Sequence, residues 1–280
     1  MVSMKNKPPI VSVVIVTLNE EKHIGNCLKS IIAQTYPRDR LEIIVVDNAS
    51  TDRTVLIAKK YTRKVYNKGP QRSAQRNYGH SKATGEFFLY LDADMSLSPK
   101  VIKSCVQHMT SHPSLTGLYI PEIVAGNSYW SRVRRFERSF YDSTVIDCVR
   151  FLRTSVFQAV GGFDVTMTGP EDWDFDKKVR FLGPVRLITE PLYHNESEFD
   201  LRKYLAKKSF YAKSFSKYIN KWGKEDPDVK KQFNPFYRLV GVFVENRKWL
   251  KVIASPHLYV GVLFLRILVG LSYIETRTAN

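Results

Sequence analysis

The first half of the chain alternates between short apolar segments and longer segments with helical periodicity. Val11–Thr17 and Leu41–Val46 predict buried strands rich in β-branched residues, and Phe87–Leu91 predicts another. Between them, Glu21–Ala33 places apolar residues on one helical face, and Arg72–Ala83 is also predicted as a helix. Strand–helix–strand repeats connect by right-handed crossovers, so we expect an α/β fold with a mostly parallel central sheet flanked by helices.

Size and composition agree with an ordinary packed core. The chain has 280 residues, of which 44% are hydrophobic and 25% charged, enough for one large domain with an appendage. Three scattered cysteines predict neither a disulfide framework nor a zinc site, and a reducing setting is expected. Met1–Pro9 is short and polar without an apolar core, so no signal peptide is predicted.

The charge balance is strongly positive. Lys and Arg number 43 against 27 Asp and Glu, which gives a net charge of +16. Such a surplus attracts polyanions, whether nucleic acid, phospholipid headgroups or phosphorylated ligands.

Acidic and amide side chains follow three predicted strands directly. Asn19 and Glu20 follow the first, Asp47 follows the second, and Asp92 and Asp94 follow the third. Ligands of open parallel sheets bind at the carboxyl ends of the strands. Acids gathered on one edge repel one another, so we expect them to bind a cation or to hydrogen-bond hydroxyls and base edges.

The pair Asp92 and Asp94 is the strongest candidate for a metal site. Residues i and i+2 of an extended segment point the same way. Mg²⁺ and Mn²⁺ take one or two protein carboxylates and complete their shell with phosphate and water. Alone, an Asp-x-Asp string is also explained by a solvated loop; its place directly after a buried strand strengthens the prediction.

No glycine-rich phosphate loop follows the first predicted strand, which disfavours a Rossmann dinucleotide site. A bound nucleotide would therefore be held by side chains and a metal. Arg72, Arg76 and Arg150 are candidates for phosphate contacts, with salt-bridged or solvated roles as the alternative.

A second acidic cluster, Glu171, Asp172 and Asp174, opens a predicted helix. Capping of the helix explains some of these three acids but not all of them. One carboxylate is therefore a candidate general base for an acceptor hydroxyl. His194 follows the predicted strand Val185–Ile188; a lone histidine is usually structural, and its functional interpretation is a metal or phosphate contact.

The C-terminal part differs in composition. Leu201–Lys224 predicts one basic amphipathic helix, which either lies on an anionic membrane surface or packs on the core with a solvated lysine face. His257–Ile274 is apolar all round except for Arg266. It is near the lower length limit for a membrane span, so it is expected to span, to lie on a membrane, or to be buried by protein, including a homodimer contact.

Four motifs carry a resemblance to a known family. SVVIVTLNEE, VVDNASTD, AQRNYGHSKATGEFFLYLDAD, and GGFD followed six residues later by EDWDF resemble the family-two glycosyltransferases with the GT-A fold. The resemblance covers Pro9 to Asn195. It implies that a nucleotide-sugar, UDP- or GDP-linked, lies across the strand ends, that Mg²⁺ or Mn²⁺ bridges its diphosphate, and that the sugar is transferred with inversion.

The resemblance also implies roles for single residues. On the donor side it assigns the nucleoside pocket to Thr17, Asn19 and Glu20 (the ribose contact), base recognition to Asp47, donor and metal binding to Asp92 and Asp94, and diphosphate contacts to Arg72 and Arg76. On the acceptor side it assigns the catalytic base to Asp172 and acceptor contacts to Glu171 and Trp173. In Asp94 we expect the direct metal ligand, with His194 as a further ligand.

Two departures refine the expected activity. Leu18 stands where an aromatic residue often precedes Asn, which leaves the base contact open. The Gln-x-x-Arg-Trp string of processive synthases is absent, which favours a single transfer. The C-terminal segments resemble those of membrane-associated members, so we expect a glycan or polyprenyl-linked acceptor and a cytoplasmic protein, peripheral or anchored at the cytoplasmic face of the membrane.

The expected organisation is a tail (1–9), a catalytic domain (10–200) and a membrane-associated helical appendage (201–280). Two alternatives stay open. A metal-dependent phosphohydrolase also places Asp-x-Asp after a strand, although normally after the first. A basic nucleic-acid-binding protein would use the positive charge, but here the strand ends are acidic, so no nucleic-acid partner is expected.

Overall fold

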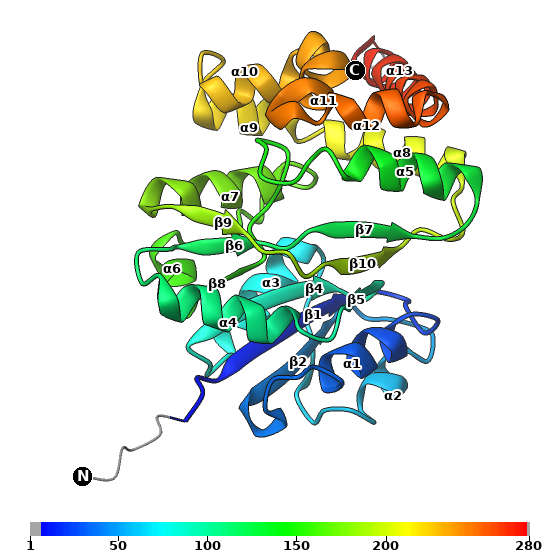
Figure 1. The fold of residues 1–280 in the computed structure, drawn as a ribbon. Helices are drawn as coiled ribbons and strands as arrows, with labels where there is room; N and C mark the ends of the chain where they lie inside the picture. The colour runs from blue at the N-terminus through cyan, green and yellow to red at the C-terminus, as the bar shows by residue number, and fades with distance from the viewer. Residues whose placement is uncertain (1–6, 279–280) are drawn as a thin grey trace. The chain divides into compact units, whose positions relative to one another are not determined.

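The computed structural model describes residues 7–278 and, through Ser272, their side chains. The chain divides into two compact units (Figure 1). The first contains the described residues up to Ile120 together with Val149–Phe163 and Lys177–Leu192. The second contains Pro121–Cys148, Asp164–Asp176 and the described residues from Tyr193 onward. The predicted C-terminal helices thus share a unit with two segments from the middle of the chain.

The first unit is built on one seven-stranded sheet. Its strand order is β3-β2-β1-β4-β8-β6-β9. The strands are β1 (Val11–Thr17), β2 (Leu41–Asp47), β3 (Val65–Asn67), β4 (Phe87–Asp92), β6 (Gly117–Tyr119), β8 (Phe151–Arg153) and β9 (Val185–Leu187). The four neighbours from β3 to β4 run parallel, and β8 is antiparallel to both β4 and β6. The expected mostly parallel α/β sheet is confirmed.

Helices cover both faces of this sheet. Side chains alternate along β1, so Val11, Val13 and Ile15 join a core cluster that includes α1 and α4 residues. Val14 points to the other face, where a Cβ added at Gly79 of α3 would lie 2.3 Å from its Cγ1. The first unit also contains α1 (Ile24–Ile32), η1 (Arg38–Arg40), α2 (Thr54–Ala58), α3 (Arg72–Ser81), β5 (Met95–Leu97), α4 (Val101–Ser111) and α6 (Thr154–Ala159).

The second unit is mainly helical. Its strands β7 (Glu122–Ala125) and β10 (Leu192–Asn195) are hydrogen-bonded neighbours. Its helices are α5 (Tyr129–Arg138), α8 (Leu201–Ala212), α9 (Phe215–Trp222), α10 (Pro227–Phe233), η2 (Tyr237–Gly241), α11 (Val242–Val244), η3 (Glu245–Arg247), α12 (Trp249–Ala254) and α13 (Pro256–Thr278). The helix α7 (Glu171–Leu182) begins in this unit and ends in the first.

The single helix expected over Leu201–Lys224 is wrong. The structure has two helices, α8 and α9, separated at Lys213 and Ser214. Neither residue is a helix breaker by itself. The Ser214 hydroxyl instead accepts a hydrogen bond from the Thr168 amide at 3.1 Å, so a tertiary contact ends the first helix.

The C-terminal helix α13 packs against α5 and α8 on one side. Val262 and Leu265 are fully buried in a cluster with Val133 and Phe140, which confirms burial by protein for this face. The opposite face stays exposed at Val260, Phe264, Ile267 and Leu271. Within residues 7–278, none of the helices has both the length and the apolar character needed to cross a membrane.

Candidate active site

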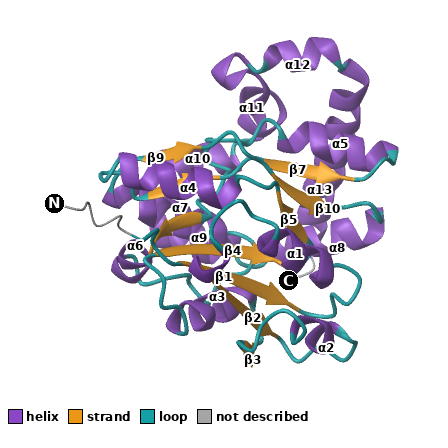
Figure 2. Cartoon of the chain, turned by 60° about the horizontal axis from the view of Figure 1, so that its bottom comes forward, coloured by secondary structure: helices purple, strands orange, loops and turns teal. Residues whose placement is uncertain are grey.

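The carboxyl ends of three adjacent strands meet at one edge of the sheet (Figure 2). The register pairs Thr17, the last residue of β1, with Asp47, the last residue of β2. On the other side of β1, Val16 pairs with Asp92 at the end of β4. The strand ends that sequence reasoning singled out therefore lie together in the first unit.

The loops that follow β1 and β2 are hydrogen-bonded to each other. The Asn19 carboxamide oxygen accepts from the Thr51 amide at 2.8 Å, and the Asn19 amide donates to the Ser50 hydroxyl at 2.8 Å. The Glu20 amide donates to the Thr54 hydroxyl at 2.7 Å. Asn19 has φ 53°, a left-handed conformation that asparagine tolerates better than most residues. These hydrogen bonds between the two loops fix the backbone from which the Asn19 and Glu20 side chains extend.

Asp47 is held in one orientation by its own loop. Its two oxygens accept from the Ser50 amide at 2.7 Å and from the Ser50 hydroxyl at 2.5 Å. Beside it, the Thr17 hydroxyl is buried and has no hydrogen-bond partner among the described residues. Buried polar atoms are normally satisfied, so this hydroxyl has spare capacity at the edge where a ligand is expected.

Asp92 lies at the centre of a cluster of arginines. Its Oδ1 is 3.0 Å from Arg76 Nη2, and its Oδ2 is 3.4 Å from Arg72 Nη1. Burial alone would raise the pKa of Asp92, but Arg76, and then Arg72, outweigh it and hold that pKa well below its usual range. Arg150 acts in the same direction. Asp92 is therefore a permanent carboxylate that orients the arginines.

The two arginines of α3 differ in access to solvent. Arg76 is 1% exposed, and its guanidinium lies 4.6 Å from the Tyr90 ring centre and 4.9 Å from that of Phe163. The Arg72 side chain is 31% exposed. Of the pair, Arg72 has the exposure that a diphosphate contact needs, whereas Arg76 has the surroundings of a positioning residue.

Asp94 follows Asp92 with alternating burial. Ala93 is buried at 2% exposure, while both aspartates are half-buried. The extended segment expected through Asp94 ends at Asp92, because Ala93 and Asp94 form a turn between β4 and β5. No group of three or more His, Cys, Asp or Glu side chains in the described range is arranged to hold a metal by itself. Two neighbouring carboxylates still fit Mg²⁺ or Mn²⁺ when a diphosphate supplies the remaining oxygens.

Sequence reasoning missed Gln75. Its buried carboxamide nitrogen donates to the Thr17 carbonyl at 3.0 Å and to the Val46 carbonyl at 2.7 Å, so it ties the ends of β1 and β2 to α3. The signal was present: Arg72, Gln75, Arg76 and Gly79 recur at helical spacing and share one face of α3. Gly79 allows this face to approach the sheet closely.

The three carboxylates of the second acidic cluster, at the start of α7, differ in burial and in contacts. Glu171 is 1% exposed and accepts from the Gly169 amide, so its contacts are those of a cap. Asp174 is fully buried, accepts from Trp222 Nε1 at 3.0 Å and pairs with Lys221 Nζ at 2.7 Å. Asp172 is half-buried. Of the three carboxylates it has the access to solvent that a general base needs.

The surroundings of Asp172 are tightly packed. Trp173 lies about equally far from Phe215, Tyr218 and Phe233, with ring centres 6.0–6.1 Å apart. Gly169 has φ 104°, and a Cβ there would lie 2.5 Å from the Tyr211 Cβ. Glycine is therefore required where this loop passes α8.

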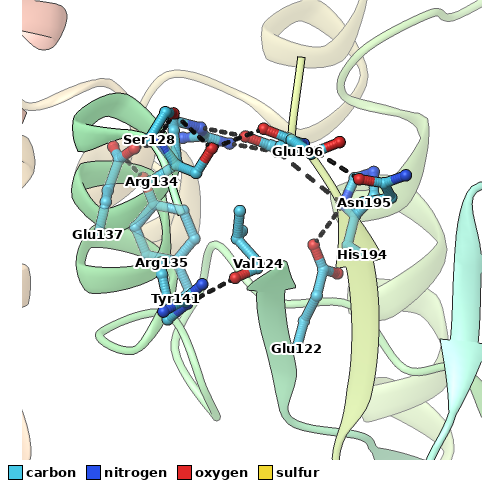
Figure 3. A network of polar contacts seen from close by, with 12 residues as sticks. Glu122, Val124, Ser128, Arg134, Arg135, Glu137, Tyr141, His194, Asn195 and Glu196 are labelled. Atoms are coloured by element: carbon cyan, nitrogen blue, oxygen red, sulfur yellow. Dashed lines mark hydrogen bonds and ion pairs between the residues drawn. The ribbon is translucent and has the colours of Figure 1, made fainter. Parts of the chain in front are cut away.

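His194 belongs to a polar network of the second unit (Figure 3). Its Nδ1 lies 2.9 Å from Glu122 Oε1, and Glu122 also accepts from Arg138 Nη2 at 2.6 Å. Glu196 binds Arg134 through two hydrogen bonds of 3.0 and 3.2 Å. These contacts fit a histidine that stabilises the fold of the second unit. Metal ligation by His194 stays a prediction.

The structure thus gathers the predicted donor-side residues in one unit. Thr17, Asn19, Glu20, Asp47, Arg72, Arg76, Asp92 and Asp94 all belong to the first unit. The predicted acceptor-side residues Glu171, Asp172 and Trp173, and His194, belong to the second. The three cysteines are buried, and none of them forms a disulfide.

The parallel sheet with acidic strand ends is that of the GT-A class of nucleotide-sugar-binding folds. The mannosyltransferase PcManGT from Pyrobaculum calidifontis, solved with GDP-Man and Mn²⁺, superposes with a TM-score of 0.67 at 17% identity. The match covers 97% of this chain and 88% of that one. At this identity the likeness establishes the fold and nothing further.

The model of the family "Glycosyl transferase family 2" matches residues 12–162, and the chain belongs to this family. TarS of Staphylococcus aureus, a poly(ribitol-phosphate) beta-N-acetylglucosaminyltransferase, is 34% identical over 110 residues, which are 37% of this chain and 19% of TarS. A Methanococcus voltae glycosyltransferase whose name gives a dolichyl-linked acceptor is 25% identical over 167 residues, 49% of this chain and 51% of that protein. The chain therefore spans 19% and 51% of the length of these two relatives.

Proposed function

We propose that this protein is an inverting glycosyltransferase. It moves one sugar from a nucleotide-diphospho-sugar, UDP- or GDP-linked, to a hydroxyl of a glycan or polyprenyl-linked acceptor. The observation that carries the proposal is the alignment of the β1, β2 and β4 ends, which puts Asn19, Asp47 and Asp92 on one edge of the sheet. Neither alternative, phosphohydrolase or nucleic-acid-binding protein, gains support from the family match.

The donor site would use the strand-end loops. Asp47 has both oxygens already occupied by Ser50, so it recognises the base with the lone pairs that remain, and it reaches the base in a fixed orientation. Glu20 extends from a loop fixed by Thr54 toward the ribose hydroxyls. Arg72, half-exposed and paired with Asp92, is the cation available to the diphosphate.

Asp94, with Asp92 beside it, would hold Mg²⁺ or Mn²⁺. The fit rests on the chemistry of the donors: two half-buried carboxylates that leave most of the coordination sphere to phosphate and water. When bound, the ion neutralises charge on the departing diphosphate.

Asp172 is proposed as the base that takes the proton from the acceptor hydroxyl. Glu171 and Asp174 are buried whereas Asp172 is half-buried, and this difference in access to solvent supports Asp172. Deprotonation lets the acceptor oxygen attack the anomeric carbon from the face opposite the nucleotide, which inverts the configuration. Trp173 and Glu171 would shape the acceptor side through packing and capping.

A membrane-linked acceptor would suit the second unit. Trp249, Leu250 and Ile253 of α12 are exposed, as are Phe264 and Ile267 of α13. Exposed apolar residues on a basic chain favour peripheral binding at the cytoplasmic face of an anionic membrane. A homodimer through α13 would cover part of the same face, and vesicle flotation beside sedimentation velocity separates the two.

The test is a donor screen with the purified chain, Mn²⁺ and a panel of nucleotide-sugars, read out as hydrolysis or transfer. One donor should bind in titration calorimetry, and Asp94→Ala should weaken that binding at least tenfold. Asp39→Ala, a change at an exposed aspartate of the same unit, is the matched control. Undiminished donor binding by Asp94→Ala, or no binding of any nucleotide-sugar by the wild type, would refute the proposal.

A further inference from the structure

Five basic side chains of the second unit gather around two tyrosine rings. One of them, Arg138 of α5, lies 5.6 Å from the ring centre of Tyr141 and is paired with Glu122. Arg134 of α5 and Lys208 of α8 lie 5.2 and 5.4 Å from the ring centre of Tyr204. Arg238 of η2 and Arg266 of α13 lie 5.9 and 5.8 Å from the ring centre of Tyr141. Four elements far apart in sequence thus bring cations into one region of the unit.

The acids of this region leave two of the five cations without an ion pair. Glu137 contacts Arg134 and lies 2.9 Å from Arg266 Nε, while Glu196 binds Arg134. Lys208 and Arg238 have no carboxylate partner in the part of the chain that the structure describes. Two uncompensated positive charges at partly buried positions are costly, because desolvation is not repaid by an ion pair.

Donor groups in the region also lack acceptors. The Arg266 side chain is only 7% exposed, and its Nη1 has no hydrogen-bond partner among the described residues. The Nη1 of Arg238 is likewise buried, with no acceptor within residues 7–278. Burial, and next the charge of Arg134, lower the pKa of Lys208 to about 7, as expected where positive charge is in excess. An unmade buried hydrogen bond typically costs about 1–3 kcal/mol, so an anion that accepts from these donors would be stabilising.

The excess charge and the number of free donors select the chemistry of the ligand. A phosphate monoester carries about −1.5 to −2 charges and offers three strong acceptor oxygens, whereas a carboxylate carries one charge and two oxygens. Guanidinium groups match phosphate geometry in paired hydrogen bonds. A phosphoryl group therefore balances Lys208 and Arg238 where a single carboxylate does not.

We propose that Lys208 and Arg238, with Arg266 beside them, form a binding site for a phosphoryl group. The site goes beyond the proposed sugar transfer, because its ligand need not react. Free phosphate and a lipid headgroup share this chemistry, and the test distinguishes the two sources.

The test compares two double variants of the full chain with equal loss of charge. Lys208→Met with Arg238→Gln removes the two unpaired cations. Arg202→Gln with Lys203→Met removes two exposed cations of α8. Each protein is titrated with inorganic phosphate by calorimetry and is floated with phosphatidylcholine vesicles that contain phosphatidic acid, in physiological salt.

The site variant should bind at least tenfold more weakly than the wild type, and the control variant should bind within twofold of it. If the protein floats with the vesicles but does not bind inorganic phosphate, the ligand is a lipid. If it binds both probes, the phosphoryl group suffices. Equal losses in both variants would show general surface attraction and overturn the proposal, as would a wild type that binds neither probe.

Two further measurements keep the result interpretable. Nucleotide-sugar affinity, measured in the same variants, should be unchanged, so a failed phosphate site and a failed donor site give different results. If the double variant does not fold, Lys208→Met alone removes no ion pair. Phosphate or phosphatidic acid should raise the melting temperature of the wild type but not of this variant, and an equal rise in both would overturn the proposal.

Discussion

The two units of this protein use charge in opposite ways. In the first, carboxylates and amides stand at the strand ends, and the loops that carry them are hydrogen-bonded to one another. In the second, charged groups such as Glu137 and Arg266 are buried between helices. The first arrangement leaves polar groups at the strand ends, where a ligand is expected, whereas the buried ion pairs of the second hold helices against one another.

This difference separates binding from proton transfer in the proposed reaction. Donor contacts fall in the first unit and the candidate base in the second. A variant in one unit should therefore impair one step and leave the other measurable. Four variants test this difference between the two units.

The largest effect is expected for Asp172→Asn. Loss of the general base should lower transfer by about 10²–10⁴-fold, while nucleotide-sugar affinity stays within twofold of the wild type. Initial rates of transfer and titration calorimetry measure the two quantities, with Asp39→Asn as the control. Full turnover by Asp172→Asn would remove this residue from the reaction.

Glu137→Ala should be strongly destabilising, because it leaves the buried guanidinium of Arg266 without its carboxylate. Removing one partner of a buried pair costs about 3–5 kcal/mol in the free energy of unfolding. Urea denaturation measures it, and Glu225→Ala is the control, since that ion pair is exposed. A loss below that of the control would contradict the structural role of the network.

Glu137 also makes the stability of the protein fall at acidic pH. Burial opposes its charged form, but Arg134, and then Arg266, keep the pKa of Glu137 below its usual range. The unfolded chain therefore binds the proton first as the pH falls below about 4.3. The contribution of Glu137 to stability is present above that pH and is lost toward lower pH.

Asp147→Asn should change the slope of stability against pH. Burial raises the pKa of Asp147 to about 7. Between the unfolded value of about 3.9 and 7 the folded state binds the extra proton, so wild-type stability falls as the pH rises. Relative to Asp147→Asn, the wild type should lose about 1–3 kcal/mol between pH 5 and 8. Parallel slopes for the two proteins would contradict this, and Asp39→Asn should match the wild type.

Ser128→Ala should have the smallest effect. The Ser128 hydroxyl accepts from the Ser131 amide at 3.0 Å and caps α5. Its removal should cost about 1 kcal/mol of unfolding free energy. Thermal denaturation measures the change beside Ser216→Ala, an exposed position inside α9 that should not destabilise. A neutral Ser128→Ala would show that α5 is held by packing alone.

Sequence patterns predicted the longer elements of the first unit well, because each of these has a recognisable local pattern. The run of β-branched residues in Val11–Thr17 coincides with β1, and Arg72–Ala83 differs from α3 by two residues. The strand-end residues followed from topology, since parallel strands must end on the same edge. Short strands such as Phe151–Arg153 were missed, because three residues carry no readable period.

The second unit could be predicted only in part, because long-range contacts decide its details. The break between α8 and α9 depends on the Thr168 amide, 46 residues away from Ser214 in sequence. The roles of Glu171 and Asp174 depend on Gly169, Trp222 and Lys221. No periodicity within the EDWDF string distinguishes a cap, an ion-pair partner and a candidate base.

Arg266 sets the rotation of α13 about its own axis. Its Nε and Nη2 bind Glu137 and the Tyr141 hydroxyl, both at 2.9 Å. Rolling the helix by one residue, about 100°, would withdraw the guanidinium from both and turn the Phe264 side of the helix inward. Arg266, the one charged residue between positions 258 and 274, thus fixes the rotation of α13 and determines which apolar face the helix exposes.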